Sequence, residues 1–208
     1  MRCLGELKAY QARGKKLANP AGGSLILGLP DSRSPSIYQE IQAVATVIPD
    51  AQVFLGAQAS AKILREKGPR SRFIHIATHG FFRPDKPIFS GFRLAGTFLT
   101  LWDLYRLKLP AEQITLSGCS TGVNVIASGD ELIGLMRGLL SAGARSLLLS
   151  LWDVHDSSTA MFMKSFYRNF FSCSDRASAL RQAMLELREE NPHPYYWAPF
   201  VLVGNVLA

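Results

Sequence analysis

Cysteine is scarce in this chain of 208 residues, and its placement excludes two kinds of cross-linked fold. The three cysteines, Cys3, Cys119 and Cys173, are odd in number, lie far apart and include no C-x-x-C pair. Neither a disulfide framework nor a cysteine zinc site is therefore supported. We expect reduced thiols and, with them, a cytoplasmic protein.

Long apolar runs are also missing. The longest uncharged stretch, residues 113–129, is too short and too rich in Ser, Thr, Gly and Asn to span a bilayer. The first residues carry charges where a secretion signal has its apolar core. The sequence thus predicts neither a membrane span nor export.

Charge is sparse, at 19 % of residues, although 23 basic against 16 acidic side chains give a net charge of +7. The basic residues cluster only modestly, as on a solvated surface, so no nucleic-acid partner is predicted. Hydrophobic residues make up 48 % of the chain, which is enough to bury a core. We expect one domain over residues 23–208, preceded by a tail or linker over residues 1–22.

Short apolar runs alternate with longer amphipathic segments, the pattern of an α/β fold with parallel strands and crossover helices. Six strands are predicted, at residues 24–29, 51–55, 72–78, 113–117, 146–152 and 199–206. Helices are predicted at residues 36–48, 59–67, 101–107, 131–142, 157–171 and 176–190. A long insert, residues 81–110, separates the third strand from the fourth, and loops of that length usually carry structure or function.

A histidine and a cysteine, residue types that serve as base and nucleophile in enzymes, follow neighbouring strands of this predicted sheet. His79 comes after the third strand and Cys119 after the fourth, and each is next to glycine. Because parallel strands end at the same edge of a sheet, these side chains can meet there. A nearby imidazole makes a thiolate available near neutral pH and later protonates the leaving amine. The N–H groups of Gly80 and Cys119 could then bind the oxyanion of a tetrahedral intermediate.

Four segments together resemble a CHAT domain. They are IHIATHGFF (74–82), LSGCSTG (116–122), the run from GDELIG to KSFY (129–167), and HPYYWAPFVLVG (193–204). CHAT domains belong to the caspase and separase group of cysteine peptidases and often follow tetratricopeptide repeats. The resemblance implies a caspase-like three-layer α/β sandwich and a His79–Cys119 dyad with Gly80 in the oxyanion hole, and it makes a tetratricopeptide-repeat region a possible partner. No cofactor or metal is predicted, because the sequence has no clustered carboxylate loop that would hold calcium. Ser120 departs from the acidic residue that many CHAT sequences have after the cysteine.

The segment after the fifth strand hints at the substrate. Its sequence, WDVHD (152–156), is similar to the W-D-V-T-D stretch of separases, where an acidic residue receives a P1 arginine. Asp153 and Asp156 would pair with a guanidinium, which predicts cleavage after Arg and, less strongly, Lys. The competing interpretation is that Asp156 or Ser157 caps the following helix.

Other functions stay open from the sequence. A CHAT-like module could bind a partner in its cleft without cutting it. Residues 118–122 also fit G-x-S-x-G, which makes Ser120 a candidate nucleophile of a serine hydrolase, but such an elbow needs a helix directly after the serine, and the next helix is predicted only near Asp130. Among the remaining candidates, His75 is predicted to be a buried core group, His193 a structural residue and Cys173 incidental, while His155 could reach the site.

Overall fold

A computed structural model describes residues 22–31, 35–83, 85–118, 130–152, 156–173 and 175–205 of the chain. In chain order, its strands and α-helices are β1 (Gly22–Gly28), α2 (Ile37–Ala45), β2 (Ala51–Leu55), α3 (Ala61–Lys67), β3 (Ser71–Ala77), β4 (Gly80–Phe81), β5 (Gly91–Leu94), β6 (Thr97–Thr100), α4 (Leu101–Leu104), β7 (Gln113–Ser117), α5 (Asp130–Ser141), β8 (Ser146–Ser150), α6 (Asp156–Cys173), α7 (Arg176–Glu190), α8 (Pro194–Trp197) and β9 (Phe200–Gly204).

The six predicted strands form one sheet, in the order β2-β1-β3-β7-β8-β9. Neighbours from β2 to β8 pair in parallel, whereas β9 pairs antiparallel with β8 at the edge. The predicted α/β class with a mostly parallel sheet is therefore confirmed, and each strand begins and ends within two residues of its predicted bounds.

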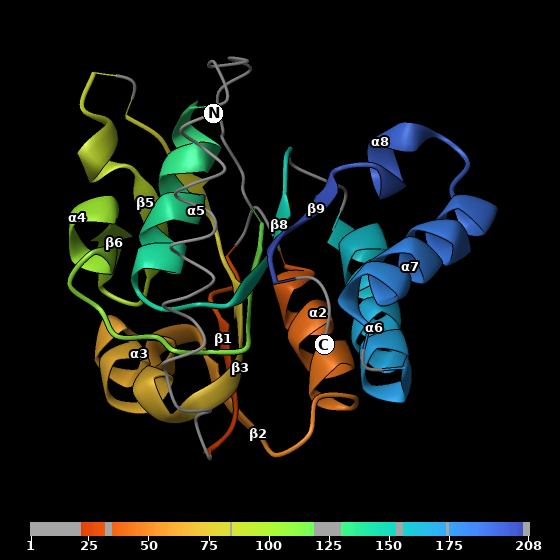
Figure 1. The fold of residues 1–208 in the computed structure, drawn as a ribbon, viewed down its shortest axis with the longest axis horizontal. Coiled ribbons are helices and arrows are strands. Elements are labelled where there is room, and N and C mark those ends of the chain that lie inside the picture. Colours follow the sequence, from red (N-terminus) through yellow and green to blue (C-terminus); the bar gives the residue numbers. More distant parts are fainter. Residues whose placement is uncertain are drawn as a thin grey trace.

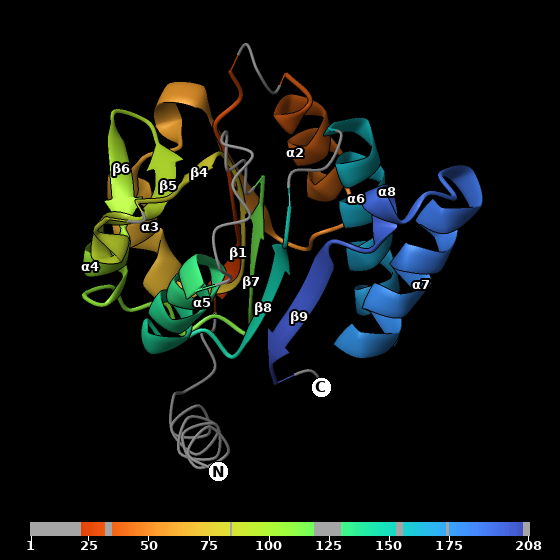
Figure 2. The same ribbon diagram turned by 90° about the horizontal axis from the view of Figure 1, so that it is seen from above.

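Helices cover both faces of the sheet and make a three-layer sandwich (Figures 1 and 2). Because side chains alternate along a strand, β3 divides its residues between two cores. Ile74 and Ile76 pack on the face covered by α3, α4 and α5. Phe73 and Ala77 pack on the other face, beneath α2, α6 and α7.

The long insert holds a small sheet that the sequence did not predict. Strands β4, β5 and β6 form this separate antiparallel sheet, and α4 follows directly, within the helix predicted at residues 101–107. Thr100 and Asp103 start α4 with a capping box, each side chain bonding the other's backbone N–H. Phe92 of β5 is fully buried against the α3–α5 core, which fixes the insert beside the carboxyl end of β3.

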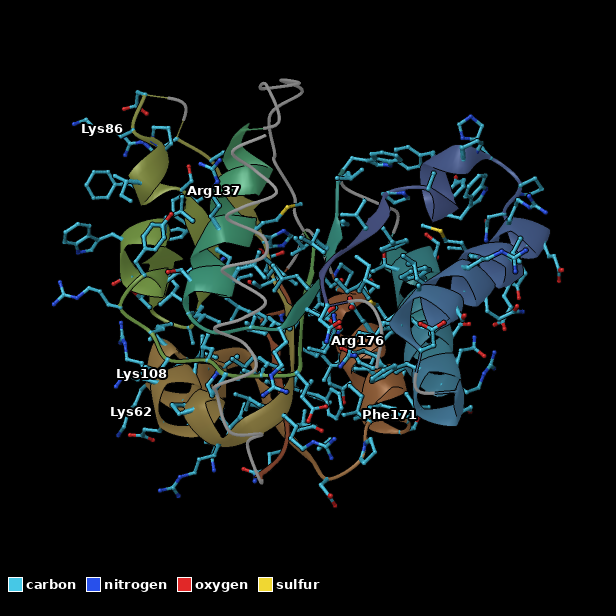
Figure 3. The ribbon with its side chains drawn as sticks, viewed as in Figure 1. Lys62, Lys86, Lys108, Arg137, Phe171 and Arg176 are labelled. Carbon is cyan, nitrogen blue, oxygen red and sulfur yellow. The ribbon has the colours of Figure 1, made fainter. Side chains whose placement is uncertain are left out.

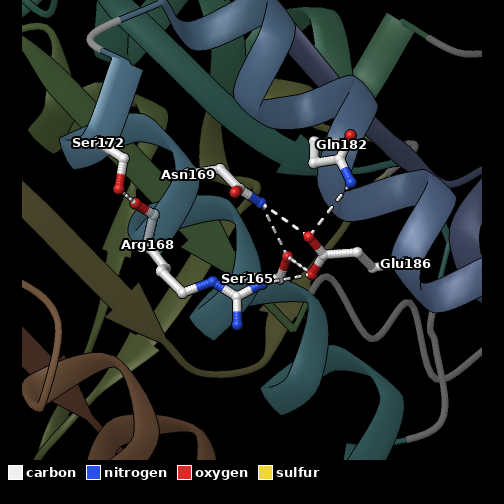
Figure 4. Close-up of polar contacts among 6 residues, drawn as sticks. All are labelled: Ser165, Arg168, Asn169, Ser172, Gln182 and Glu186. Atoms are coloured by element: carbon white, nitrogen blue, oxygen red, sulfur yellow. Dashed lines mark hydrogen bonds and ion pairs between the residues drawn. The ribbon is translucent and has the colours of Figure 1, made fainter.

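A cluster of partly buried polar side chains joins α6 to α7 (Figure 4). The carboxylate of Glu186 accepts hydrogen bonds from Ser165, Asn169 and Gln182 and pairs with Arg168 at 2.6 Å. Burial alone would raise the pKa of Glu186, but these hydrogen bonds and the arginine outweigh it and lower the pKa. The cluster thus fixes the two long helices against each other on the outer side of the sandwich.

Within the described ranges, no helix has both the length and the apolar character needed to cross a membrane.

Candidate active site

The carboxyl ends of β3, β7 and β8 lie side by side, so His79 and the strands that lead toward Cys119 and Asp153 end at one edge of the sheet. His79 follows β3 by two residues, and Ser117 ends β7 two residues before Cys119. The backbone pairing continues past both strands: Thr78 N–H donates to the Ser117 carbonyl at 3.0 Å, and Gly80 N–H donates to the Gly118 carbonyl at 3.3 Å. His79 is thus held against the segment that leads into Cys119, which itself lies outside the described residues.

Gly118 makes this close approach possible. Its φ of +84° lies in the left-handed region, and a Cβ there would stand 2.5 Å from the carbonyl oxygen of Thr78. A side chain at position 118 would therefore push β7 away from the His79 segment and misplace the residue that follows.

The imidazole of His79 has a carboxylate partner that the sequence analysis missed. Nε2 of His79 lies 3.2 Å from Oδ1 of Asp31, which follows β1. The side chains are 17 % and 23 % exposed, so the pair faces solvent without being fully hydrated. In the sequence, Asp31 is visible as an acidic residue just after a predicted apolar strand. Its contact with His79 follows only from the order of strands in the sheet, in which β1 lies next to β3.

The insert fixes this pair from the other side. Nη1 of Arg93, on β5, lies 3.3 Å from Oδ2 of Asp31. The backbone N–H of Arg93 donates to the His79 carbonyl at 2.9 Å, and Thr78 Oγ1 donates to the Arg93 carbonyl at 2.7 Å. β5 therefore holds the backbone of the histidine segment while its arginine shares the carboxylate that faces the imidazole.

The Gly80 N–H, predicted as an oxyanion donor, is engaged in this structure. Its partner, the Gly118 carbonyl, lies at 3.3 Å, longer than the usual 2.9–3.0 Å of such bonds. The oxyanion role of Gly80 stays a prediction, and it requires this N–H to leave the carbonyl. The second predicted donor, the N–H of Cys119, lies outside the described residues.

The predicted P1 acids belong to the next strand along the sheet. Trp152, two residues after β8, is anchored by its indole N–H, which donates to the Tyr195 carbonyl at 3.0 Å. Asp153 and His155 lie outside the described residues, and so does the side chain of Asp156, the first residue of α6. The pocket role of Asp153 and Asp156 and the reach of His155 stay predictions.

His75, four residues before His79 on β3, belongs to a different environment. It is 1 % exposed, and its Nδ1 lies 3.2 Å from the hydroxyl of Tyr167, which donates to Thr115 Oγ1 at 2.6 Å. Its Nε2 lies 3.1 Å from Oε1 of buried Glu40, at ion-pair distance but without hydrogen-bond orientation. Burial raises the pKa of Tyr167 far above its ordinary value, so its hydroxyl stays protonated. The prediction of a buried core histidine is confirmed.

The other candidates have simpler outcomes. His193 caps α8, its Nδ1 accepting the Tyr195 N–H at 3.2 Å, as expected of a structural residue. Cys173 ends α6, and nothing is described of its side chain. Ser120 lies outside the described residues, while α5 begins at Asp130 as predicted. Over the described ranges, no three His, Cys, Asp or Glu side chains gather as a metal site would need.

The family follows from a family-model match. The model of the CHAT domain matches residues 6–205, nearly the whole chain. The chain belongs to the CHAT family. Its described fold, a six-stranded mostly parallel sheet between helices, agrees with the caspase-like sandwich implied by the sequence resemblance. The boundary between tail and domain predicted at residues 22 and 23 stays a prediction.

Two further comparisons place this CHAT chain among larger proteins. It is 35 % identical over 109 residues to tetratricopeptide repeat protein 28 of Homo sapiens and 33 % identical to that of Mus musculus, matches that cover 51 % of the chain and 4 % of each relative. Separase in the Saccharomyces cerevisiae separase–securin complex superposes with a TM-score of 0.61 at 18 % identity, over 95 % of this chain and 13 % of that one. The CHAT chain thus spans a small fraction of the proteins it resembles.

Proposed function

We propose that this CHAT domain is a cysteine endopeptidase that uses His79 and Cys119. The observation that supports the proposal most is the His79–Asp31 pair at the edge of the sheet where β7 leads into Cys119. An imidazole held by a carboxylate beside a candidate thiol is the arrangement of an activated nucleophile.

In this mechanism Asp31 orients the imidazole. If Asp31 accepts the proton on Nε2 of His79, Nδ1 is the nitrogen left to take the thiol proton. The Cys119 thiolate attacks the scissile carbonyl, the carbon–nitrogen bond breaks, and the imidazolium returns its proton to the leaving amine. Water then hydrolyses the thioester, with His79 as base. Gly80 and the Cys119 amide are the proposed oxyanion donors.

The proposed substrate is a protein cut after Arg, and less readily after Lys. Arg93 already pairs with Asp31, so a basic P1 side chain needs other carboxylates, which we assign to Asp153 and Asp156. As partners we propose protein substrates and a tetratricopeptide-repeat region, since such repeats are named in the relatives. The proposed compartment is the cytoplasm, where the three cysteines would stay reduced.

A second candidate is a CHAT module that binds a protein without cutting it. The Gly80–Gly118 hydrogen bond favours it, because that bond occupies one of the two proposed oxyanion donors. The serine-hydrolase alternative with Ser120 has no support in the caspase-like fold. Labelling of Ser120 by a fluorophosphonate, with Cys119 resistant to iodoacetamide, would revive it.

A positional peptide library tests the proposal. Wild type and Cys119→Ala are incubated with peptides that vary at P1, and products are quantified by mass spectrometry. We expect cleavage after Arg by wild type and none by the variant. Equal cleavage by both proteins excludes the dyad, binding without cleavage supports the second candidate, and preference for Asp at P1 excludes the roles assigned to Asp153 and Asp156.

A further inference from the structure

A cavity lies at the opposite end of the sheet from His79. It has a volume of about 440 Å³ and is lined by the amino ends of β1 and β3, the residues just before β7 and β8, and the junction of α6 with α7. Cavities of 300–1,000 Å³ are the usual size for small ligands. Nothing in the proposed peptidase chemistry uses this one.

Three arginines and two carboxylates line the cavity, which leaves it with an excess of positive charge. The guanidinium of Arg72 is already neutralised, because it forms two hydrogen bonds with Glu112, at 3.0 and 3.2 Å. The other carboxylate is Asp50, and the other guanidinium groups are those of Arg145 and Arg176.

Arg176 is held there by neutral partners. The residue is 6 % exposed; its Nε donates to Gln113 Oε1 at 3.2 Å and its Nη2 to the Glu112 carbonyl at 3.4 Å. Within the described chain no carboxylate forms an ion pair with it. Burial lowers the pKa of Arg176, the charges of Glu112 and Asp175 act in the opposite direction, and the charge of Arg145 adds to the lowering. A buried cation beside a second cation is stabilised by an anion.

One wall of the cavity is aromatic. Phe73, Phe170 and Phe171 contact one another edge-on or tilted, with ring centroids 5.0 to 5.7 Å apart. The guanidinium of Arg176 lies over the Phe170 ring at 4.8 Å. Figure 3 labels Phe171 and Arg176 in the same region, between the sheet and the lower end of α6. An apolar wall beside a cation suits a ligand with a flat body and one charged end.

We propose that this cavity binds a small organic anion, whose phosphate or carboxylate pairs with Arg176 and Arg145 and whose planar apolar part lies against Phe171. Guanidinium groups bind either anion by paired N–H donors, so the anionic group, rather than its source, is what the site recognises.

Isothermal titration of the full chain with two matched pairs of probes tests the site. AMP is compared with adenosine, which lacks the phosphate, and N-acetylphenylalanine with its amide, which lacks the carboxylate. The variant is Arg176→Gln, and the control is Arg168→Gln, an arginine on α6 that pairs with Glu186 outside the cavity. If Arg176→Gln does not unfold cooperatively, Arg145→Gln replaces it, since Arg145 contacts Ala111 and Asn205 through its backbone.

We expect at least one anion to bind about tenfold or more tightly than its uncharged partner, a difference that Arg176→Gln removes and Arg168→Gln keeps. Tighter binding of AMP would identify phosphate as the anionic group that the cavity recognises. Tighter binding of N-acetylphenylalanine would identify carboxylate. If neither anion exceeds its uncharged partner, or if the preference survives in the cavity variant, the proposal is wrong. Peptidase activity is not read, so this outcome is independent of the proposed function.

Discussion

Two histidines, one within β3 and one just past its end, show how position decides what the same side chain does. His75 and His79 are four residues apart, and each has a carboxylate oxygen within 3.2 Å of its Nε2. His75 sits in mid-strand with a fully buried side chain, and buried Glu40 and Tyr167 contact it. His79 sits past the strand end, 17 % exposed, with Asp31 and the insert around it. The pairing chemistry is similar, but only His79 is open to a substrate.

The largest expected effect is on activity at the exposed histidine. His79→Gln and Cys119→Ala should each lower kcat/KM by about 1,000-fold or more, because the base and the nucleophile act as one unit. Neither should alter the thermal unfolding midpoint by more than a few degrees, since both residues follow strand ends. Steady-state cleavage of a P1-Arg peptide and a thermal melt check this, and near-normal activity in either variant would remove that residue from the mechanism.

The buried pair should respond in stability instead. Glu40→Ala leaves His75 facing no carboxylate in the core, and we expect the free energy of unfolding to fall by about 3 kcal/mol or more. Asp31→Ala, at the exposed pair, should cost about 1 kcal/mol or less. Urea titrations of both variants measure the contrast. Equal losses would mean that burial does not distinguish the two pairs.

Asp31 is a positioning residue, so its effect on activity should be intermediate. Asp31→Asn should lower kcat by about tenfold to 100-fold with little change in KM, because the imidazole loses its orientation rather than the substrate its contacts. Asp31→Glu should recover part of the rate. The matched control is Asp85→Asn, which removes an exposed carboxylate paired with Arg83 at 2.9 Å. A fall confined to KM, or an equal fall in the control, contradicts the positioning role.

A third carboxylate, Glu186, gives the smallest effect and calibrates the others. Its lowered pKa means that its contribution to stability is complete above the ordinary value of 4.5 and is lost as the pH falls through the lower folded value. Glu186→Gln should therefore reduce stability by about 1 kcal/mol at pH 7 and not at pH 3, with unchanged peptidase activity. Urea titrations at both pH values measure it, and a constant difference would exclude the linkage.

Most of the sheet was predictable because its strands are continuous apolar runs with turn residues at their ends. β7 and β8, for example, are entirely buried, and such runs have few other interpretations. The antiparallel sheet of the insert was not predictable in the same way. β4 has two residues and β5 and β6 four each, too short for a period of two to be recognised.

The candidate site was predictable only in part. The strand ends that carry His79 and lead to Cys119 were apparent from local sequence, because each follows an apolar run. Asp31 was missed because its contact with His79 depends on the sheet order, which placed β1 rather than β2 beside β3. The engagement of the Gly80 N–H was missed because it depends on where one carbonyl, that of Gly118, points. The order of strands in a sheet and the direction of a single carbonyl cannot be predicted from a local sequence pattern.

The most direct test of the central claim, that His79 activates Cys119, needs no substrate. Three proteins are compared, each carrying Cys3→Ser and Cys173→Ser so that Cys119 is the one remaining cysteine. The first has no further substitution, the second adds His79→Gln and the third adds Asp31→Asn. The rate of Cys119 alkylation by iodoacetamide is measured in each from pH 5 to pH 10. A free thiol reacts with a midpoint at about pH 8.5. The account predicts a midpoint at least about one pH unit lower in the protein with His79, a return toward the free value in His79→Gln and an intermediate profile in Asp31→Asn. The same profile in all three proteins would contradict it.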